Sequence, residues 1–151
     1  LAFDAVTLHP YLGKDALAPF LRRDDKACII LCRTSNEGAS EFQDLEVNGG
    51  IPLWQKVATR VATDWNMRGN CMLVAGATYP DEIGVIRSVV GDMTLLVPGI
   101  GVQGGNVQQT VTQGMNSQGK GLIINSSRGI IFSENPARAA QELRNGINEY
   151  R

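Results

Sequence analysis

Two loops rich in small residues, in the second half of the chain, have the composition of a site that binds an oxyanion. Residues 98–105 read PGIGVQGG and residues 125–129 read NSSRG. Glycine and serine allow a loop to approach a ligand closely and to direct backbone N–H groups at it. Arg128 adds a planar side chain that can donate two hydrogen bonds to one anion. These residue types in this order predict a site for a phosphate group.

Each loop directly follows a short apolar segment that predicts a β-strand. Residues 93–97 (MTLLV) precede the first loop, and residues 121–124 (GLII) precede the second. The carboxyl ends of parallel strands meet at one edge of a sheet, so both loops should reach the same edge. In (β/α)8 barrels, phosphate sites are often built from the loops after the last two strands.

The remaining sequence continues this alternation of strand and helix. Apolar segments predict three further strands, at 4–8, 27–31 and 71–75. The spacing of apolar residues, together with proline and capping residues, predicts helices at 15–23, 52–66, 79–90, 107–115 and 135–150. A shorter helix at 39–45 is expected inside the long connection 32–50. Strict alternation favours a parallel sheet with right-handed crossovers.

Five strand–helix units fit two α/β architectures. They can form an open doubly wound sheet, or the latter part of a (β/α)8 barrel. The loops that follow the predicted strands are long and rich in glycine and polar residues, whereas the loops that precede the strands are short. This asymmetry places any active site at the carboxyl edge of the sheet in either architecture.

The segment 99–104 also satisfies the pattern GxGxxG of dinucleotide-binding sites. That fingerprint requires an acidic residue about 20 positions further on, which binds a ribose. No Asp or Glu occurs between Asp92 and Glu134. The sequence therefore favours a phosphate-binding loop, and a nucleotide-dependent oxidoreductase is kept as an alternative.

The bulk composition excludes several classes of protein. The chain has 151 residues, of which 43% are hydrophobic and 19% charged, and a formal net charge of −1, as expected for a soluble globular domain. This charge gives no electrostatic basis for binding nucleic acid or an anionic membrane. No apolar segment approaches the roughly 20 residues that span a bilayer, and no signal peptide opens the chain.

The cysteines and the histidine point to structural roles. Cys28, Cys32 and Cys71 lie in apolar segments, and His9 is the only histidine. An odd number of cysteines in core segments indicates reduced thiols and a cytoplasmic protein. A closed zinc site needs about four ligands, so we expect no metal. A lone histidine at a strand end is expected to make a structural hydrogen bond.

The segment 33–38 (RTSNEG) follows the second predicted strand and allows two interpretations. Ser35 can cap the short helix that begins near residue 39. It can equally bind the polar edge of a ligand at the carboxyl edge of the sheet. The residues by themselves leave both open.

Four segments, read together, resemble the orotidine 5′-monophosphate decarboxylase family, and are closest to its bacterial-type branch. They are DAVTLHPYLG at 4–13, RTSNEGA at 33–39, VPGIGVQGG at 97–105 and NSSRGI at 125–130. The resemblance covers nearly the whole chain, in order. It implies a (β/α)8 TIM barrel that decarboxylates orotidine 5′-monophosphate to uridine 5′-monophosphate, the last step of pyrimidine nucleotide synthesis. The family uses no metal and no cofactor.

The resemblance also assigns roles to single residues. Arg128 and the backbone around Ser127 would bind the phosphate, and Gln103 would lie between the phosphate and the pyrimidine ring. Pro98 would line the ring pocket, and Ser35 would bind the amide edge of the pyrimidine. The substrate-binding positions that follow from it are Ser35, Pro98, Gly99, Gly101, Gln103, Gly104, Ser127 and Arg128. As partners it implies a nucleotide substrate, a second copy in a homodimer and, in some lineages, fusion to orotate phosphoribosyltransferase.

The family's catalytic lysine and aspartates lie in an Asp-x-Lys-x-x-Asp motif on the third strand, and this chain has no such motif. We therefore expect residues 1–151 to form one partial barrel domain, made of strands four to eight, with the first three strands absent. The catalytic residues would then lie outside the chain. A phosphate-binding half-barrel without catalytic activity is the alternative of a different class.

Overall fold

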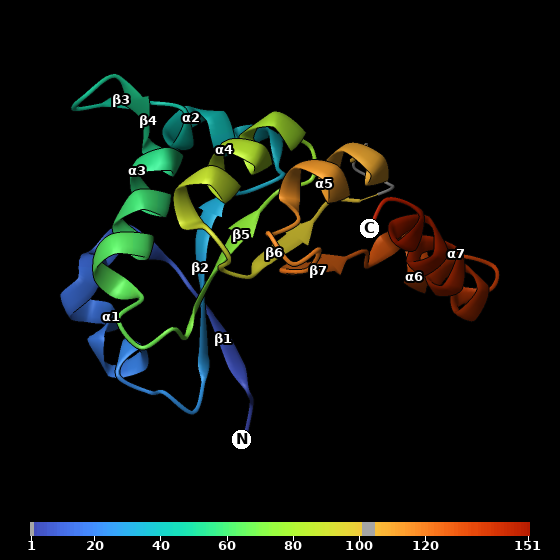
Figure 1. Ribbon diagram of the computed structural model, residues 1–151, viewed down its shortest axis with the longest axis horizontal. Coiled ribbons are helices and arrows are strands. Elements are labelled where there is room, and N and C mark those ends of the chain that lie inside the picture. The colour runs from blue at the N-terminus through green and yellow to red at the C-terminus, as the bar shows by residue number, and fades with distance from the viewer. Residues whose placement is uncertain (1, 101–104) are drawn as a thin grey trace.

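Five parallel strands form the sheet on which the helices pack (Figure 1). The computed structural model describes residues 2–100 and 105–151. All neighbouring strands are parallel, as the alternation predicts, and the strand boundaries differ from the predicted ones by at most two residues. In sheet order the strands are β1 (Ala5–Leu8), β2 (Ala27–Arg33), β5 (Cys71–Ala75), β6 (Leu95–Pro98) and β7 (Leu122–Asn125).

The connections between the strands carry the helices. The longer ones each overlap a predicted helix and are α1 (Gly13–Leu21), α3 (Leu53–Arg60), α4 (Pro80–Val90), α5 (Val107–Gly114) and α7 (Pro136–Glu149). The short helical segments are η1 (Pro10–Leu12), η2 (Glu37–Ala39), α2 (Ser40–Gln43), η3 (Val61–Trp65) and α6 (Arg128–Ile131). The helix predicted at 52–66 is thus α3 followed by the π-helical turn η3.

Two helix starts show what local sequence decides. The sequence predicts Asn135 as the cap of the last helix, and this is confirmed, because its side chain accepts a hydrogen bond from the backbone N–H of Arg138 at 3.0 Å. The sequence predicts Pro52 in the first turn of its helix, but it lies in extended conformation directly before α3, as the end of β4 (Ile51–Pro52). β4 pairs antiparallel with β3 (Glu46–Val47). Strands of two residues are too short to produce a pattern, so the sequence does not predict this hairpin.

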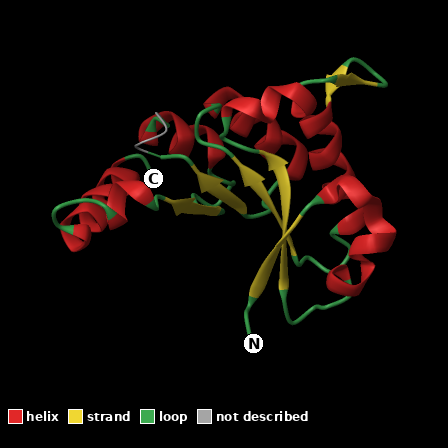
Figure 2. Ribbon diagram, turned by 180° about the vertical axis from the view of Figure 1, so that it is seen from behind, coloured by secondary structure: helices red, strands yellow, loops and turns green. Residues whose placement is uncertain are grey.

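The two faces of the sheet differ in burial, and the helices lie against one of them (Figure 2). The buried positions on the helix-covered face include Ile30, Leu73, Leu95 and Val97. Most positions that alternate with them are only partly buried, such as Ile29, Leu31, Met72 and Leu96, whereas Val74 is buried. The continuous apolar run at 27–31 predicts a strand buried on both faces, but β2 alternates between buried and partly buried positions, because no layer covers the second face in the described chain. Partly covered apolar side chains are what the inner face of an unclosed barrel presents.

The sheet does not close on itself. In the described residues, β1 and β7 are the two outer strands, and each pairs with a neighbour on one side only.

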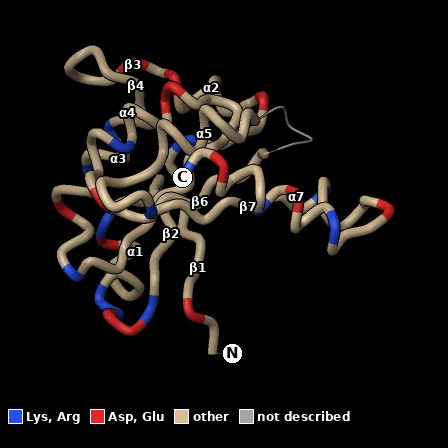
Figure 3. Tube along the Cα trace, turned by 45° about the vertical axis from the view of Figure 1, so that its right-hand side comes forward, with Lys and Arg blue, Asp and Glu red and all other residues tan. Residues whose placement is uncertain are grey.

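No helix that the structure describes has the length and apolar character needed to cross a membrane. Basic and acidic residues are interspersed along the chain (Figure 3).

The cysteines and the histidine have the structural roles that the sequence predicts. The three thiols are free and buried, and Cys28 and Cys71 are register partners on β2 and β5. The Nδ1 atom of His9 accepts a hydrogen bond from the backbone N–H of Tyr11 at 3.1 Å and caps η1. Trp54 and Trp65 are packing residues in the core and are 6% and 8% exposed.

Candidate functional site

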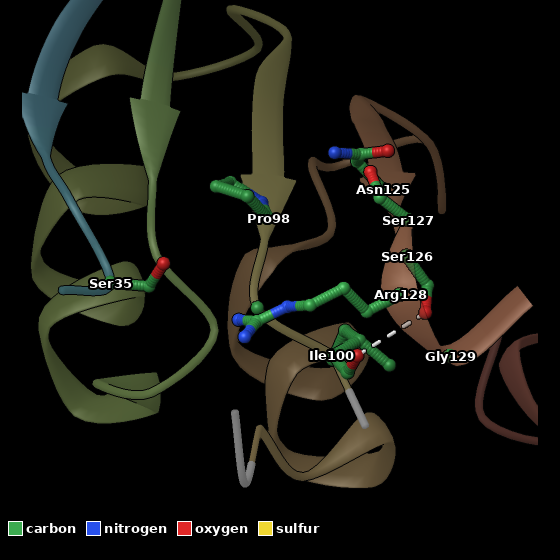
Figure 4. A pocket seen from close by; sticks show the side chains of 9 residues that line it. Ser35, Pro98, Ile100, Asn125, Ser126, Ser127, Arg128 and Gly129 are labelled. Carbon is green, nitrogen blue, oxygen red and sulfur yellow. Dashed lines mark hydrogen bonds between the residues drawn. The ribbon is translucent and has the colours of Figure 1, made fainter. Parts of the chain in front are cut away.

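The predicted loops meet in a pocket at the carboxyl edge of the sheet (Figure 4). Its volume is about 180 Å³, below the roughly 300–1,000 Å³ of a typical ligand pocket, so it suits part of a nucleotide. It is lined by Ser35, Pro98, Gly99, Ile100, Asn125, Ser126, Ser127, Arg128 and Gly129. The structure therefore brings together five predicted positions: Ser35, Pro98, Gly99, Ser127 and Arg128. Gly101, Gln103 and Gly104 lie outside the described residues.

The strand ends set the position of two of the pocket walls. Pro98 and Asn125 are the last residues of β6 and β7, and they are register partners. The carbonyl oxygen of Pro98 accepts a hydrogen bond from the backbone N–H of Ala77 at 2.8 Å, which ties the end of β6 to the loop after β5. Proline has no N–H to donate, so Pro98 cannot act as a donor in the hydrogen-bonded ladder of the sheet.

The base of the glycine loop is closed by its two outer glycines. The backbone N–H of Gly105 donates to the carbonyl oxygen of Gly99 at 3.3 Å. Gly99 has a φ of +100°, which disfavours any residue with a side chain. A Cβ at Gly105 would lie 2.7 Å from the Cβ of Ala77. Glycine is therefore required at both ends of this loop for geometric reasons, in addition to any contact with a ligand.

Among the described residues that line the pocket, Arg128 is the only ionisable one, and it follows β7 as the first residue of α6. Its side chain extends across the pocket toward the side that carries Pro98 and Ser35 (Figure 4). The apolar segment before it predicts an arginine at the mouth of a buried strand, but Arg128 is exposed, because β7 alternates between partly buried and exposed positions. No acidic side chain of the described chain forms an ion pair with it. Its guanidinium is thus available to bind an anion.

The serines beside Arg128 connect the two loops. The hydroxyl of Ser126 donates to the carbonyl oxygen of Ile100 at 3.4 Å, which links the arginine loop to the glycine loop. The carbonyl oxygen of Ser127 accepts backbone hydrogen bonds from Ile130 and Ile131, at 3.2 and 2.8 Å. The chain turns into α6 at this point, so Arg128 is presented from the start of a helical turn.

Ser35 lines the pocket and is not a helix cap. The residue before η2 is Asn36, and the residue before α2 is Ala39. Ser35 lies one position too early for the first and four positions too early for the second. Of the two interpretations that the sequence left open, the cap is therefore wrong. Contact with a ligand stays a prediction that the pocket geometry supports.

Sequence reasoning missed two residues that hold the Ser35 loop, Arg33 and Gly76. Arg33 is 1% exposed and pairs with Glu82 and Asp44. Gly76 donates its backbone N–H to the carbonyl oxygen of Arg33 at 2.8 Å. The available signal was an arginine that ends an apolar strand and directly precedes the loop. The sequence indicates for Glu82 only an acid that suits the first turn of α4.

The groups that line the pocket are suited to binding a ligand. The described residues of its lining include no carboxylate, lysine, histidine or cysteine. Among the residues that the structure describes, no group of three or more His, Cys, Asp or Glu side chains is arranged to hold a metal ion. The arrangement can hold an anion through Arg128 and the backbone, and can orient a flat polar group between Ser35 and Pro98.

Comparison with known proteins gives the site a family context. The model of the orotidine 5′-phosphate decarboxylase / HUMPS family matches residues 1–143. The chain is 49% identical to an orotidine 5′-phosphate decarboxylase of Aromatoleum aromaticum, over 98% of this chain and 57% of that protein. It is 50% identical to the one of Janthinobacterium sp. (strain Marseille), over 97% of this chain and 56% of that protein.

Solved structures agree with these matches. The Leishmania donovani OMP decarboxylase superimposes with a TM-score of 0.90 at 39% identity, over 97% of this chain and 57% of that chain. The Leishmania donovani UMP synthase superimposes with a TM-score of 0.93 at 42% identity, over 98% of this chain and 33% of that chain. The five strands correspond to part of a (β/α)8 barrel, as expected. The chain spans somewhat more than half the length of the curated relatives named above.

Proposed function

This chain belongs to the orotidine 5′-phosphate decarboxylase / HUMPS family, and from that premise we propose that it is the substrate-binding part of an orotidine 5′-monophosphate decarboxylase. The longer enzyme would release carbon dioxide from orotidine 5′-monophosphate and form uridine 5′-monophosphate. The observation that carries the proposal is the pocket itself. It unites Ser35, Pro98 and Arg128, from the ends of three strands, at the edge where such barrels bind substrates.

Binding of the phosphate is the step that this chain is best equipped to perform. Arg128 offers a charged, two-pronged donor without an acidic partner in the described chain, and the small residues of both loops let the phosphate approach the backbone. A hydrogen bond to a charged group contributes about 1.5–3 kcal/mol. Binding energy from this remote group can be used to orient the reacting ring.

The other wall of the pocket suits the pyrimidine. Pro98 presents an apolar surface at the end of β6, and Ser35 lies on the same rim, from the loop after β2. We propose that Pro98 lines the ring and that Ser35 binds its amide edge. Gln103 would bridge the ring and the phosphate, and Gly101 and Gly104 would line the phosphate.

The bond-breaking step needs groups that this pocket does not contain. When the carboxylate leaves as carbon dioxide, its electron pair stays on the ring carbon, and an acid must then donate a proton there. We propose that an Asp-x-Lys-x-x-Asp motif outside this chain supplies a lysine for that proton. The aspartates would hold this lysine and crowd the substrate carboxylate. Residues 1–151 would then correspond to strands four to eight of the barrel.

The assembly and location of the longer protein follow from the same premise. We propose a cytoplasmic homodimer that takes a nucleotide substrate. The match to a third of the Leishmania donovani UMP synthase chain supports a link, in some relatives, to a further domain such as orotate phosphoribosyltransferase. The matched family and relatives favour a decarboxylase over the nucleotide-dependent oxidoreductase considered from the sequence.

Decarboxylation of orotidine 5′-monophosphate by the full-length protein, followed by the loss of orotate absorbance, tests the proposal. Turnover that is lost when the motif lysine is replaced would support it. Binding of uridine 5′-monophosphate without turnover would favour the phosphate-binding half-barrel instead. If the protein shows no binding and no turnover, both the decarboxylase and the phosphate-binding half-barrel are refuted.

A further inference from the structure

Arg33 is the only buried charged side chain among the described residues, and it lies two positions before Ser35. Its Nε atom donates to a carboxylate oxygen of Glu82 at 2.5 Å, and its terminal nitrogen contacts Asp44 at 3.2 Å. Its guanidinium also lies 3.9 Å from the ring centre of Tyr79. One side chain therefore joins the end of β2 to the first turn of α4 and to the end of α2.

A second set of contacts runs from this arginine into the Ser35 loop. The side-chain oxygen of Gln43 accepts from Arg33 at 3.4 Å and from the backbone N–H of Thr34 at 2.9 Å. The amide nitrogen of Gln43 donates to the Thr34 hydroxyl at 2.8 Å, and that hydroxyl donates to Asn36 at 2.6 Å. The residues on both sides of Ser35 are thus held in one network that starts at Arg33.

The energetics of this cluster indicate that it fixes the position of the loop more than it stabilises the fold. Burying an arginine beside two partly exposed carboxylates costs desolvation, and buried ion pairs can often be replaced by apolar residues without loss of stability. What an apolar residue cannot replace is the directional link through Gln43 to the loop. The cluster also stands at the carboxyl edge, next to the pocket, where small displacements of a loop change binding.

We propose that Arg33 is a positioning residue: it holds the 34–36 loop so that Ser35 faces the pyrimidine, and it acts on recognition of the base but not of the phosphate. The inference rests on the proposed function, because it assigns the Ser35 side of the pocket to the ring. The phosphate side is built from the loop that carries Arg128, and in the described chain Arg33 forms no hydrogen bond or ion pair with that loop.

The test compares two ligands that share the phosphate but not the base. We would measure the affinity of the full-length protein for uridine 5′-monophosphate and for ribose 5-phosphate. Arg33→Met should lower the affinity for uridine 5′-monophosphate about tenfold or more, which is equivalent to about 1.4 kcal/mol. The affinity for ribose 5-phosphate should stay within about twofold of the wild-type value. Arg87→Met, at the opposite edge of the sheet, is the matched control and should change neither affinity.

Gln43→Ala keeps both ion pairs of Arg33 and removes only the link to the loop. It therefore tests the same proposal if Arg33→Met fails to fold. It should show the same selective loss for uridine 5′-monophosphate. An equal loss for both ligands, or a lowered unfolding temperature with both affinities intact, would overturn the proposal. A wild-type protein that binds ribose 5-phosphate but not uridine 5′-monophosphate would refute the proposed function, and the role of Arg33 with it.

Discussion

Gly76 lies directly against Ser35, because a Cβ at position 76 would come within 2.8 Å of the Ser35 backbone nitrogen and 2.9 Å of its Cα. These are backbone atoms, which cannot move aside as a flexible side chain can. Only glycine at the end of β5 therefore allows the loop after β2 to reach its position on the pocket rim. The shape of the pocket depends on this close approach as much as on the residues that line it.

Gly76→Ala should displace the Ser35 loop and weaken binding of uridine 5′-monophosphate, with a loss of stability of about 1–3 kcal/mol from overpacking. Gly146→Ala is the control, because nothing lies within 4 Å of a Cβ there and the residue is in the helix α7. That change should stabilise the protein by about 0.5–1 kcal/mol. Titration and urea unfolding of both variants measure the two effects. Unchanged affinity in Gly76→Ala would show that the Ser35 loop does not contact the ligand.

Arg128→Ala should weaken binding of both uridine 5′-monophosphate and ribose 5-phosphate about 10- to 100-fold, because it removes a charged donor to the phosphate. The free energy of unfolding should stay nearly constant, since the side chain is exposed and makes no ion pair in the described chain. Arg144→Ala, on the exposed surface of α7, should leave binding intact. If wild type and Arg128→Ala bind both ligands with equal affinity, Arg128 does not bind the phosphate.

Arg87 offers a contrast to Arg33, since its contacts serve stability at the amino edge of the sheet. It donates to the carbonyl oxygens of Gly114 at 2.8 Å, Met93 at 2.6 Å and Gly121 at 3.1 Å, and also contacts that of Gly91. Arg87→Met removes these hydrogen bonds, although the carbonyl oxygen of Gly121 keeps the backbone N–H of Leu95 as a donor, and it should cost about 3 kcal/mol of unfolding free energy. Ligand affinity should not change. Chemical denaturation beside a binding titration separates the two effects, and a loss of affinity in the folded variant would contradict the assignment.

The buried thiols should be nearly inert in the folded protein. Burial raises the pKa of Cys32 to about 12 and that of Cys71 to about 11, so the reactive thiolate is scarce at pH 8. A thiol reagent should modify the native protein slowly and the urea-unfolded protein quickly, at three sites. Rapid labelling of the native state would show that the core opens.

The same pKa shifts set the sign of a pH effect on stability. A thiol whose pKa is higher in the folded state binds its proton more tightly there, so its contribution is fully present below the unfolded pKa of about 9. The contribution is lost as the pH rises from about 9 toward 11–12. Urea unfolding at pH 8 and at pH 10 should therefore give a smaller free energy at the higher pH. Replacing Cys32 by Ala should reduce that difference.

The order of strands and helices could be predicted from the sequence because each depends on neighbours in the chain. Alternating apolar segments, the Asn135 cap with Pro136 behind it, and long polar loops after the strands are all local features. The two loops of the pocket were also predicted to meet, since their strands are consecutive and parallel strands share an edge. The residue types and their order in the chain were therefore enough to assign Gly99 and Arg128 to one site.

The tertiary structure decided the features that join distant parts of the chain. Arg33 meets Glu82, 49 positions later, and Gly76 meets Ser35 only because β2 and β5 are neighbours in the sheet. The half-exposed second face of the sheet likewise depends on which layers pack against it. Local sequence records the preference of each segment for helix or strand. Burial, ion pairing and steric fit depend on the packing of segments that the sequence does not place side by side.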